Sequence, residues 1–144
     1  MNNKLSEFLT NELIKQYGEE TYNKIIEGYN QKRFTTLRVN TLKSKVSYIC
    51  SALSENNIEY EKVSWNNEAL IIKNANEIDI KELKIYKNGE IYLQSLSSMM
   101  PAIILEPKEN EDILDMTAAP GGKTTQIAAL TNNKANITAC EMNT

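Results

Sequence analysis

The segment Asp115–Thr125 contains the residues whose types and spacing most directly predict ligand binding. Between Thr117 and Gly122 no side chain is large, so the backbone of this stretch can approach a ligand closely. Gly121 and Gly122 can adopt backbone conformations that other residues avoid. The residues that follow are predicted to form a helix, and the first amides of a helix favour an anion. The pattern therefore predicts a loop that binds a carboxylate or a phosphate.

A nucleotide-hydrolysing P-loop is one alternative, because Gly122-Lys123-Thr124 resembles the end of that motif. The P-loop pattern requires a glycine five residues before the Gly-Lys pair, at position 117. That position holds Thr117, and Ala118-Ala119-Pro120 offers little of the amide nest that surrounds phosphates. The P-loop is therefore the less favoured of the two interpretations.

Glu141 is the second position with a predicted ligand role. It follows the segment Asn136–Cys140 directly and lies 20 residues after Gly121. In nucleotide-binding βαβ units, an acid about 20 residues beyond the glycine loop accepts hydrogen bonds from ribose hydroxyls. The alternative is a solvated glutamate in a loop, and the loop at 117–122 favours the ribose role.

Two strands and a helix must position these residues. Asp112–Met116 is predicted as a short strand, Lys123–Thr131 as a helix and Asn136–Cys140 as a second strand. A strand, a glycine-containing turn, a helix, a strand and an acid in this order begin a doubly wound nucleotide-binding sheet. The sequence therefore predicts an α/β fold in which residues 96–144 form the first βαβ unit of a Rossmann-like domain.

Residues 1–95 predict a small α+β accessory domain, with a boundary near residue 95. Apolar residues at helical spacing predict helices over residues 5–17, 22–29 and 46–53, the third with Ser44 as its N-cap. Phe34–Asn40 and Ile91–Gln94 are predicted as strands, and Ile58–Trp65 and Ala69–Lys73 as a hairpin that turns at Asn66-Asn67. A further helix is predicted over Leu96–Leu105, and its Pro101 is acceptable if the helix begins near Ser98.

The composition limits the available chemistry. The chain has 144 residues, 41% of them hydrophobic, with a formal net charge of −3, and it has no long apolar run or signal-like start. We therefore expect a cytoplasmic protein without a membrane segment. With no histidine and only two widely spaced cysteines, Cys50 and Cys140, no metal site is expected. Cys50 lies on an apolar helical stripe and is expected to be buried.

Four stretches together resemble a known family. Asp115-Met116-Thr117-Ala118-Ala119-Pro120-Gly121-Gly122-Lys123-Thr124-Thr125 is similar to the cofactor-binding motif of the Sun/Fmu-like (RsmB/RsmF-type) RNA 5-methylcytosine methyltransferases. Upstream, Arg38-Val39-Asn40 resembles that family's Arg-Val-Asn signature, and Gln94 with Ser97-Ser98-Met99 resembles its Gln…Ser-Ser-Met stretch. Ala139-Cys140-Glu141 is similar to the acid-bearing end of the second strand.

The resemblance implies S-adenosyl-L-methionine as the cofactor and RNA, either ribosomal or transfer RNA, as the partner. Glu141 is then expected at the ribose hydroxyls. Lys123 is expected to meet an anion, either the cofactor carboxylate or Asp115. The set expected around the methionine end of the cofactor is Thr117, Ala118, Ala119, Pro120, Gly121, Gly122 and Lys123.

In this family the resemblance also implies a catalytic cysteine thiolate in a Pro-Cys motif and a second cysteine in a Thr-Cys motif, both well beyond the ribose-binding acid. Neither Cys50 nor Cys140 matches these motifs. We therefore expect the 144 residues alone to be inactive, and their two-stranded sheet to be incomplete and open to pairing between chains. A non-catalytic RNA-binding module remains an alternative function.

Two further groups of polar residues have open roles. Arg38 and Lys43, with Lys32 and Arg33 nearby, are either RNA phosphate contacts or ordinary surface residues. Gln94, Ser97 and Ser98 either support the cofactor site from behind or cap the helix that follows them.

Overall fold

The computed structural model describes residues 5–31 and 33–142. The chain divides into two compact units, Met1–Arg33 and Phe34–Thr144, which are described separately below. Among the described residues, no helix is both long enough and apolar enough to cross a membrane.

The first unit contains helices α1 (Glu7–Tyr17) and α2 (Glu19–Asn30), which confirms both predicted helices. The Ser6 side chain accepts a hydrogen bond from the Leu9 amide at the start of α1. Gly18 separates the helices with a φ of 78°, a conformation that favours glycine. Helix α1 buries none of its residues. Lys32, one of the four basic residues considered for RNA contact, lies outside the described residues.

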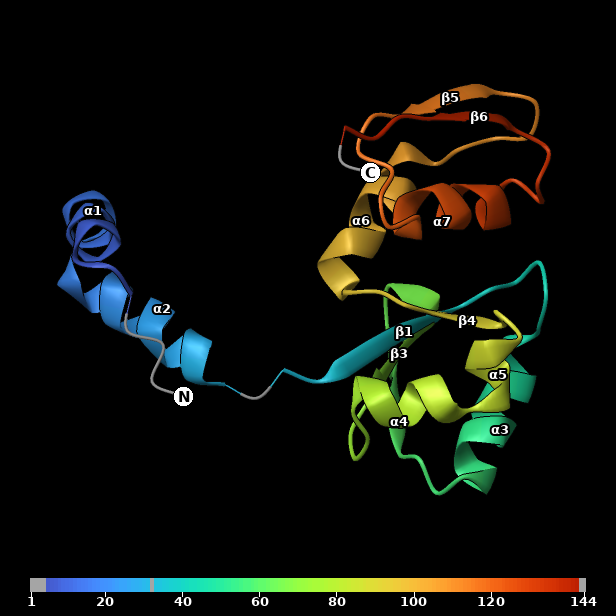
Figure 1. Cartoon of the computed structure of the whole chain (residues 1–144), viewed down its shortest axis with the longest axis horizontal. Coiled ribbons are helices and arrows are strands. Elements are labelled where there is room, and N and C mark those ends of the chain that lie inside the picture. The colour runs from blue at the N-terminus through green and yellow to red at the C-terminus, as the bar shows by residue number, and fades with distance from the viewer. Residues whose placement is uncertain (1–4, 32, 143–144) are drawn as a thin grey trace. The chain divides into compact units, whose positions relative to one another are not determined.

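The larger unit begins with a four-stranded antiparallel sheet in the order β2-β3-β1-β4 (Figure 1). Its strands are β1 (Thr35–Val39), β2 (Tyr60–Val63), β3 (Asn66–Ile72) and β4 (Ile91–Leu93). The accompanying helices are α3 (Val46–Glu55), α4 (Glu77–Glu82) and α5 (Lys84–Lys87). The chain order β-α-β-β-α-β with this strand order is the ferredoxin-like arrangement. The predicted α+β accessory fold is therefore confirmed.

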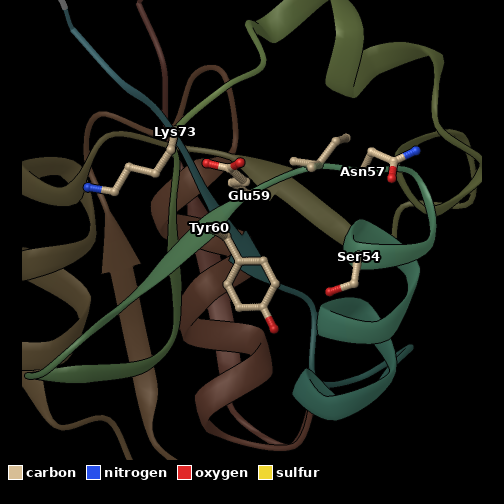
Figure 2. Close-up of a pocket in the computed structure, with 6 residues that line it drawn as sticks. Ser54, Asn57, Glu59, Tyr60 and Lys73 are labelled. Carbon is tan, nitrogen blue, oxygen red and sulfur yellow. The ribbon is translucent and has the colours of Figure 1, made fainter.

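An apolar core holds one face of this sheet to its helices. Leu37 and Val39 of β1 are fully buried, as are Ile49 and Leu53 of α3. Alternate residues of a strand point to opposite faces, so Arg38 must lie on the other face. At the edge of this core, an open cavity of about 570 Å³ lies between α3, β2 and the end of β3 (Figure 2). Its lining includes Ser54, Asn57, Tyr60 and Lys73, and none of the lining residues belongs to the loop at 117–123.

Two local predictions were wrong in detail. The hairpin turns at Ser64-Trp65, because Val63 pairs with Asn66, and the Asn66 side chain accepts a hydrogen bond from the Glu68 amide within β3. The N-cap of α3 is Lys45, which makes no side-chain capping bond, and not Ser44. Helix α6 (Leu96–Leu105) has the predicted bounds, and the Ser95 side chain caps its start. Pro101 therefore lies in its second turn and has no N–H to donate to the preceding turn.

The predicted βαβ unit is confirmed. Strands β5 (Asp112–Asp115) and β6 (Asn136–Ala139) pair in parallel, with Asp112 opposite Asn136 and Asp115 opposite Ala139. Helix α7 (Gly122–Leu130) connects them and packs against α6 (Figure 1). In the part of the chain that the structure describes, this second sheet has two strands. Leu114 of β5 remains 57% exposed, so one face of the sheet is uncovered within these residues.

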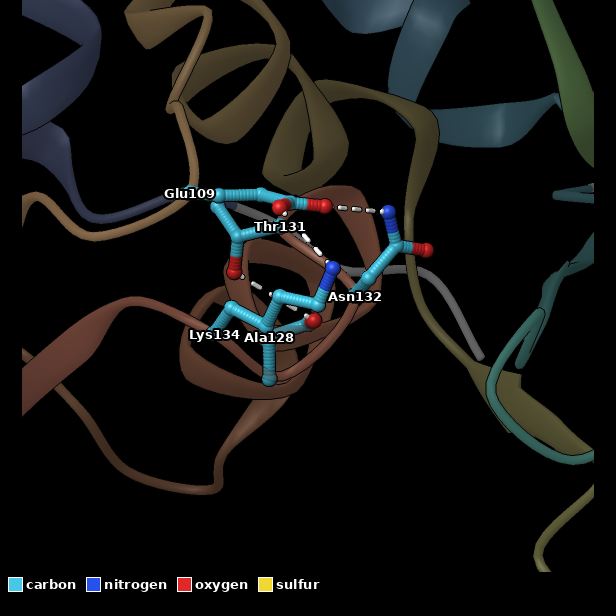
Figure 3. Close-up of polar contacts among 5 residues, drawn as sticks. All are labelled: Glu109, Ala128, Thr131, Asn132 and Lys134. Carbon is cyan, nitrogen blue, oxygen red and sulfur yellow. Dashed lines mark hydrogen bonds and ion pairs between the residues drawn. The ribbon is translucent and has the colours of Figure 1, made fainter.

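Side-chain hydrogen bonds connect the far end of α7 to the start of β5. Glu109, just before β5, accepts hydrogen bonds from Asn132 Nδ2 and Lys134 Nζ, both at 2.9 Å (Figure 3). At the last turn of α7, the Thr131 hydroxyl donates to the Ile127 carbonyl at 2.9 Å. The two hydrogen bonds to the Glu109 carboxylate lower its pKa below the ordinary value, and the bond from Asn132 is the larger cause, followed by the bond from Lys134. These contacts hold the connection between α7 and β6 against the segment that precedes β5.

Candidate functional site

Asp115 holds the two sides of the loop together. Its carboxylate is buried, and it accepts hydrogen bonds from the Thr117 amide at 3.2 Å and the Thr124 hydroxyl at 2.6 Å. Thr117 begins the loop, and Thr124 lies in the first turn of α7. The carboxylate at the end of β5 therefore connects the start of the loop to the first turn of α7.

The loop closes on itself just before α7. The Gly121 amide donates to the Ala118 carbonyl at 2.6 Å, and the Ala118 amide donates to the Cys140 carbonyl at 3.0 Å. Gly121 has a φ of 102°, which L side chains rarely adopt, whereas Gly122 is the first residue of α7 and has no positive φ, so the glycine conformation expected for both is found only at Gly121. Gly121 is the N-cap of α7 and provides no capping side chain. The first-turn amides of α7 therefore suit an anionic group, as a cofactor carboxylate requires.

Glu141 lies at the loop, as its position after the second strand predicted. Its Oε2 accepts a hydrogen bond from the Ala119 amide at 3.1 Å, and its Oε1 accepts one from the Met142 amide at 2.8 Å. Parallel strands end at the same edge of a sheet, so the loop after β5 and the acid after β6 meet there. The two halves of the predicted site are therefore adjacent.

Lys123 contacts the loop rather than Asp115. Its Nζ donates to the Thr117 carbonyl at 2.7 Å. The ion pair with Asp115, one of the two alternatives expected for Lys123, is not found, and the Asp115 carboxylate is hydrogen-bonded to Thr117 and Thr124 instead. The lysine ammonium bridges the start of the loop and the first turn of α7.

Residues of the accessory sheet form a wall behind the loop, which the sequence predicted only in part. The Tyr92 hydroxyl donates to the Pro120 carbonyl at 2.7 Å. Gln94 Nε2 donates to Gln126 Oε1 of α7 at 3.1 Å and to the Ser98 carbonyl at 3.0 Å. Gln94 was one candidate for support of the site from behind. Tyr92 and Gln126 lie beside the motif residues in the sequence, but no role was predicted for them.

The RNA-contact interpretation of Arg38 is wrong for this structure. Arg38 is 1% exposed, so a phosphate cannot reach it from solvent. Its Nε donates to Gln94 Oε1 and its Nη2 donates to Thr125 Oγ1, both at 3.1 Å. Lys43 donates instead to the Asn88 carbonyl at 3.0 Å and joins the two loops beside β4. Arg33 is exposed, and its RNA contact stays a prediction.

The two cysteines lie in different surroundings. Cys50 is buried in the accessory core, as predicted, and its side-chain hydrogen bond with Tyr60 raises the pKa of that tyrosine. Cys140 is exposed, and its backbone amide donates to the Asp115 carbonyl at 2.8 Å. Across residues 5–31 and 33–142, no cluster of histidine, cysteine or acidic side chains could hold a metal ion.

Comparison with known proteins identifies the family. The profile described as the RsmF/B-like methyltransferase ferredoxin-like domain matches residues 5–79, which is more than half of the chain. The profile described as 16S rRNA methyltransferase RsmB/F matches residues 102–144. The chain belongs to the RsmB/F methyltransferase family. The boundary predicted between residues 95 and 96 lies between the two matched segments and stays a prediction.

Individual relatives agree with this assignment. The chain is 34% identical over 136 residues to the probable ribosomal RNA small subunit methyltransferase B of Bacillus subtilis, covering 94% of this chain and 30% of that protein. It is 42% identical over 105 residues to the tRNA (cytosine(49)-C(5))-methyltransferase of Pyrococcus abyssi, covering 72% of this chain and 33% of that protein. The chain therefore spans about a third of the length of these RsmB/F relatives.

A solved structure has the same fold over nearly all of this chain. The crystal structure of a methyltransferase homolog from Pyrococcus horikoshii superposes with a TM-score of 0.76 and 30% sequence identity. The match covers 94% of this chain and 48% of that one. The fold of this chain is therefore that of the matched part of this methyltransferase homolog.

Proposed function

We propose that this chain provides the accessory domain and the first half of the cofactor site of an S-adenosyl-L-methionine-dependent RNA cytosine-5 methyltransferase. The observation that supports this most strongly is the hydrogen bond from the Ala119 amide to the Glu141 carboxylate. It places the anion-binding loop next to an acid at the end of the following strand, as a nucleoside ligand with an anionic tail requires.

Each part of the site has a proposed role. The small residues at 117–122 allow close approach of the backbone, and the first amides of α7 receive the amino-acid carboxylate of the cofactor. Lys123 adds positive charge beside that carboxylate, and Glu141 accepts hydrogen bonds from the ribose hydroxyls. When bound, the cofactor supplies a methyl group on a positively charged sulfur. Residues of this chain hold and orient it.

The nucleophile that activates the cytosine is not proposed among these residues. Cys50 is enclosed by the apolar accessory core, and Cys140 is held by backbone hydrogen bonds at the end of β6. Neither lies in a Pro-Cys or Thr-Cys motif. We therefore propose that the 144 residues alone bind at most part of the cofactor and transfer no methyl group.

RNA is the proposed substrate class, and it rests on the relatives. The Bacillus protein is named as a ribosomal RNA methyltransferase and the Pyrococcus abyssi protein as a tRNA cytosine methyltransferase. A non-catalytic RNA-binding module is the second candidate, because the matched accessory domain alone covers residues 5–79. A P-loop hydrolase is disfavoured, because Lys123 Nζ points back to the Thr117 carbonyl and position 117 lacks glycine.

The test is methyl transfer from radiolabelled S-adenosylmethionine to RNA by the protein at its natural full length, followed by nucleoside analysis. We expect label in 5-methylcytidine from the full-length protein and none from the 144-residue chain. Label in another nucleoside, or no transfer to ribosomal or transfer RNA, would contradict the proposed reaction. Activity of the 144 residues alone would contradict the proposal that the nucleophile lies elsewhere.

A further inference from the structure

Arg38 is a buried cation that the proposed reaction does not use directly. It lies near the end of β1 between the fully buried Leu37 and Val39, with its own side chain on the opposite face of the sheet. Burying a guanidinium is costly unless it is paired and hydrogen-bonded. Among the described residues, none of the ion pairs includes Arg38. Burial lowers its pKa, and the nearby Glu68 opposes that effect.

Three side chains contact the guanidinium directly, while Glu68 acts on it only as a nearby charge. Nε donates to Gln94 Oε1 at 3.1 Å, and Nη2 donates to Thr125 Oγ1 at 3.1 Å. The guanidinium carbon lies 5.9 Å from the centre of the Tyr92 ring, within range of a cation–π interaction. Nη1 is buried and has no hydrogen-bond partner. If this position served only for packing, an apolar side chain would fill it without the desolvation penalty of a buried charge.

Each of these three neighbours also contacts the loop that we propose binds the cofactor. The Tyr92 hydroxyl donates to the Pro120 carbonyl at 2.7 Å. The Thr125 hydroxyl donates to the Gly121 carbonyl at 2.8 Å. A Cβ atom placed on Gly122 would lie 3.3 Å from Gln94 Cδ, so Gln94 packs directly against the start of α7. The three side chains that contact Arg38 therefore also contact the loop, at the successive positions 120, 121 and 122.

We propose that Arg38 is a positioning residue for the cofactor loop. Its rigid fork fixes Gln94 and Thr125, and through them it fixes the turn at Gly121 and the direction of the first amides of α7. The proposal rests on the proposed function, since it assigns a role toward the same cofactor. It also makes the accessory sheet part of the cofactor site, because β1 and β4 supply the wall that holds the loop in its binding conformation.

Two measurements on the full-length protein test this role. The first is calorimetric binding of S-adenosylhomocysteine, and the second is amide hydrogen exchange of residues 117–123 without ligand. Arg38→Met should weaken binding at least tenfold, about 1.4 kcal/mol at 25 °C, and speed exchange in the loop. Arg38→Lys should fall between Met and wild type, because a lysine keeps the charge but loses the fork.

Thr125 provides the matched partner for this test. Thr125→Val should also weaken binding, and its effect should not add to that of Arg38→Met, because both remove the same hydrogen bond. Thr125→Ser keeps the hydroxyl and should restore most of the affinity. Ile72→Val, in the accessory core, is the control for general loss of stability and should leave both affinity and loop exchange unchanged.

The outcomes separate the two proposals. If Arg38→Met and Thr125→Val bind like Ile72→Val and show normal loop exchange, Arg38 is structural only and the inference is wrong. If the wild-type protein binds no cofactor, the proposed function fails, while faster loop exchange in Arg38→Met would still support the positioning of the loop. If Arg38→Met does not fold, the Thr125 pair decides the question.

Discussion

The backbone amide of Ala119 donates a hydrogen bond of 3.1 Å to the carboxylate of Glu141, a residue 22 positions later in the chain. The bond joins the loop after β5 to the end of β6. Because Ala119 lies in the middle of the loop, the acid is held at the edge of the site at which a nucleoside would lie. The geometry of the site therefore depends on this contact as well as on the loop residues themselves.

Replacing Glu141 tests its ribose role. In the full-length protein, Glu141→Ala should weaken binding of S-adenosylhomocysteine by roughly 1–3 kcal/mol, because two hydroxyl groups lose a charged acceptor. Glu141→Gln keeps the shape and one acceptor oxygen, so its loss should be smaller. Calorimetric titration measures both. Wild-type affinity in Glu141→Ala would mean that the acid does not contact the ligand.

Gly122 should tolerate a methyl group poorly. A Cβ atom there would lie 3.3 Å from Gln94 Cδ, and Gln94 can give way only by lengthening its hydrogen bonds to Arg38, Gln126 and the Ser98 carbonyl. Gly122→Ala should therefore lower the free energy of unfolding by about 1–3 kcal/mol, measured by denaturant titration.

Gly28→Ala is the matched control for that substitution. Gly28 lies in α2 with open space around its Cα, so alanine there should be neutral or stabilising by about 0.4–1 kcal/mol. If Gly122→Ala is as well tolerated as Gly28→Ala, then Gln94 is not fixed as described.

The contacts of Glu109 predict a pH dependence of stability. Hydrogen bonds from Asn132 and Lys134 lower the pKa of Glu109 below its ordinary value of 4.5. A lowered pKa in the folded state stabilises the fold at pH values above 4.5, and this contribution is lost as the pH falls through the folded-state pKa. Wild type should therefore unfold at a higher temperature than Glu109→Gln at pH 7, and the difference should shrink toward pH 3. A difference that stays constant over this range would show that the contacts do not favour the charged carboxylate.

Much of the fold followed from local sequence patterns. Helices α1, α2 and α3 were predicted from apolar residues at helical spacing, and the βαβ unit from the order of strand, glycine turn, helix and acid. Errors occurred at element boundaries. Asn66 belongs to β3 because the register of the hairpin shifts between Lys62 and Val63 and pairs Val63 with Asn66. The N-cap of α3 is Lys45 and not Ser44.

The parts of the candidate site that could be predicted are those whose residues lie close together in the sequence. The conformation of Gly121 and the position of Glu141 follow from the glycine turn and the strand order. The role of Arg38 could not be predicted in this way. Its partners Gln94 and Thr125 lie 56 and 87 residues away, and a basic residue on a strand looks like a surface residue until the helix that covers it is known.

The most direct test of the proposed cofactor site is calorimetric titration of the full-length protein with S-adenosylhomocysteine and, separately, with ATP and Mg²⁺. The loop at 117–123 and Glu141 predict saturable binding of S-adenosylhomocysteine and no binding of ATP. Binding of ATP with Mg²⁺ and no response to S-adenosylhomocysteine would contradict the account and favour the P-loop alternative.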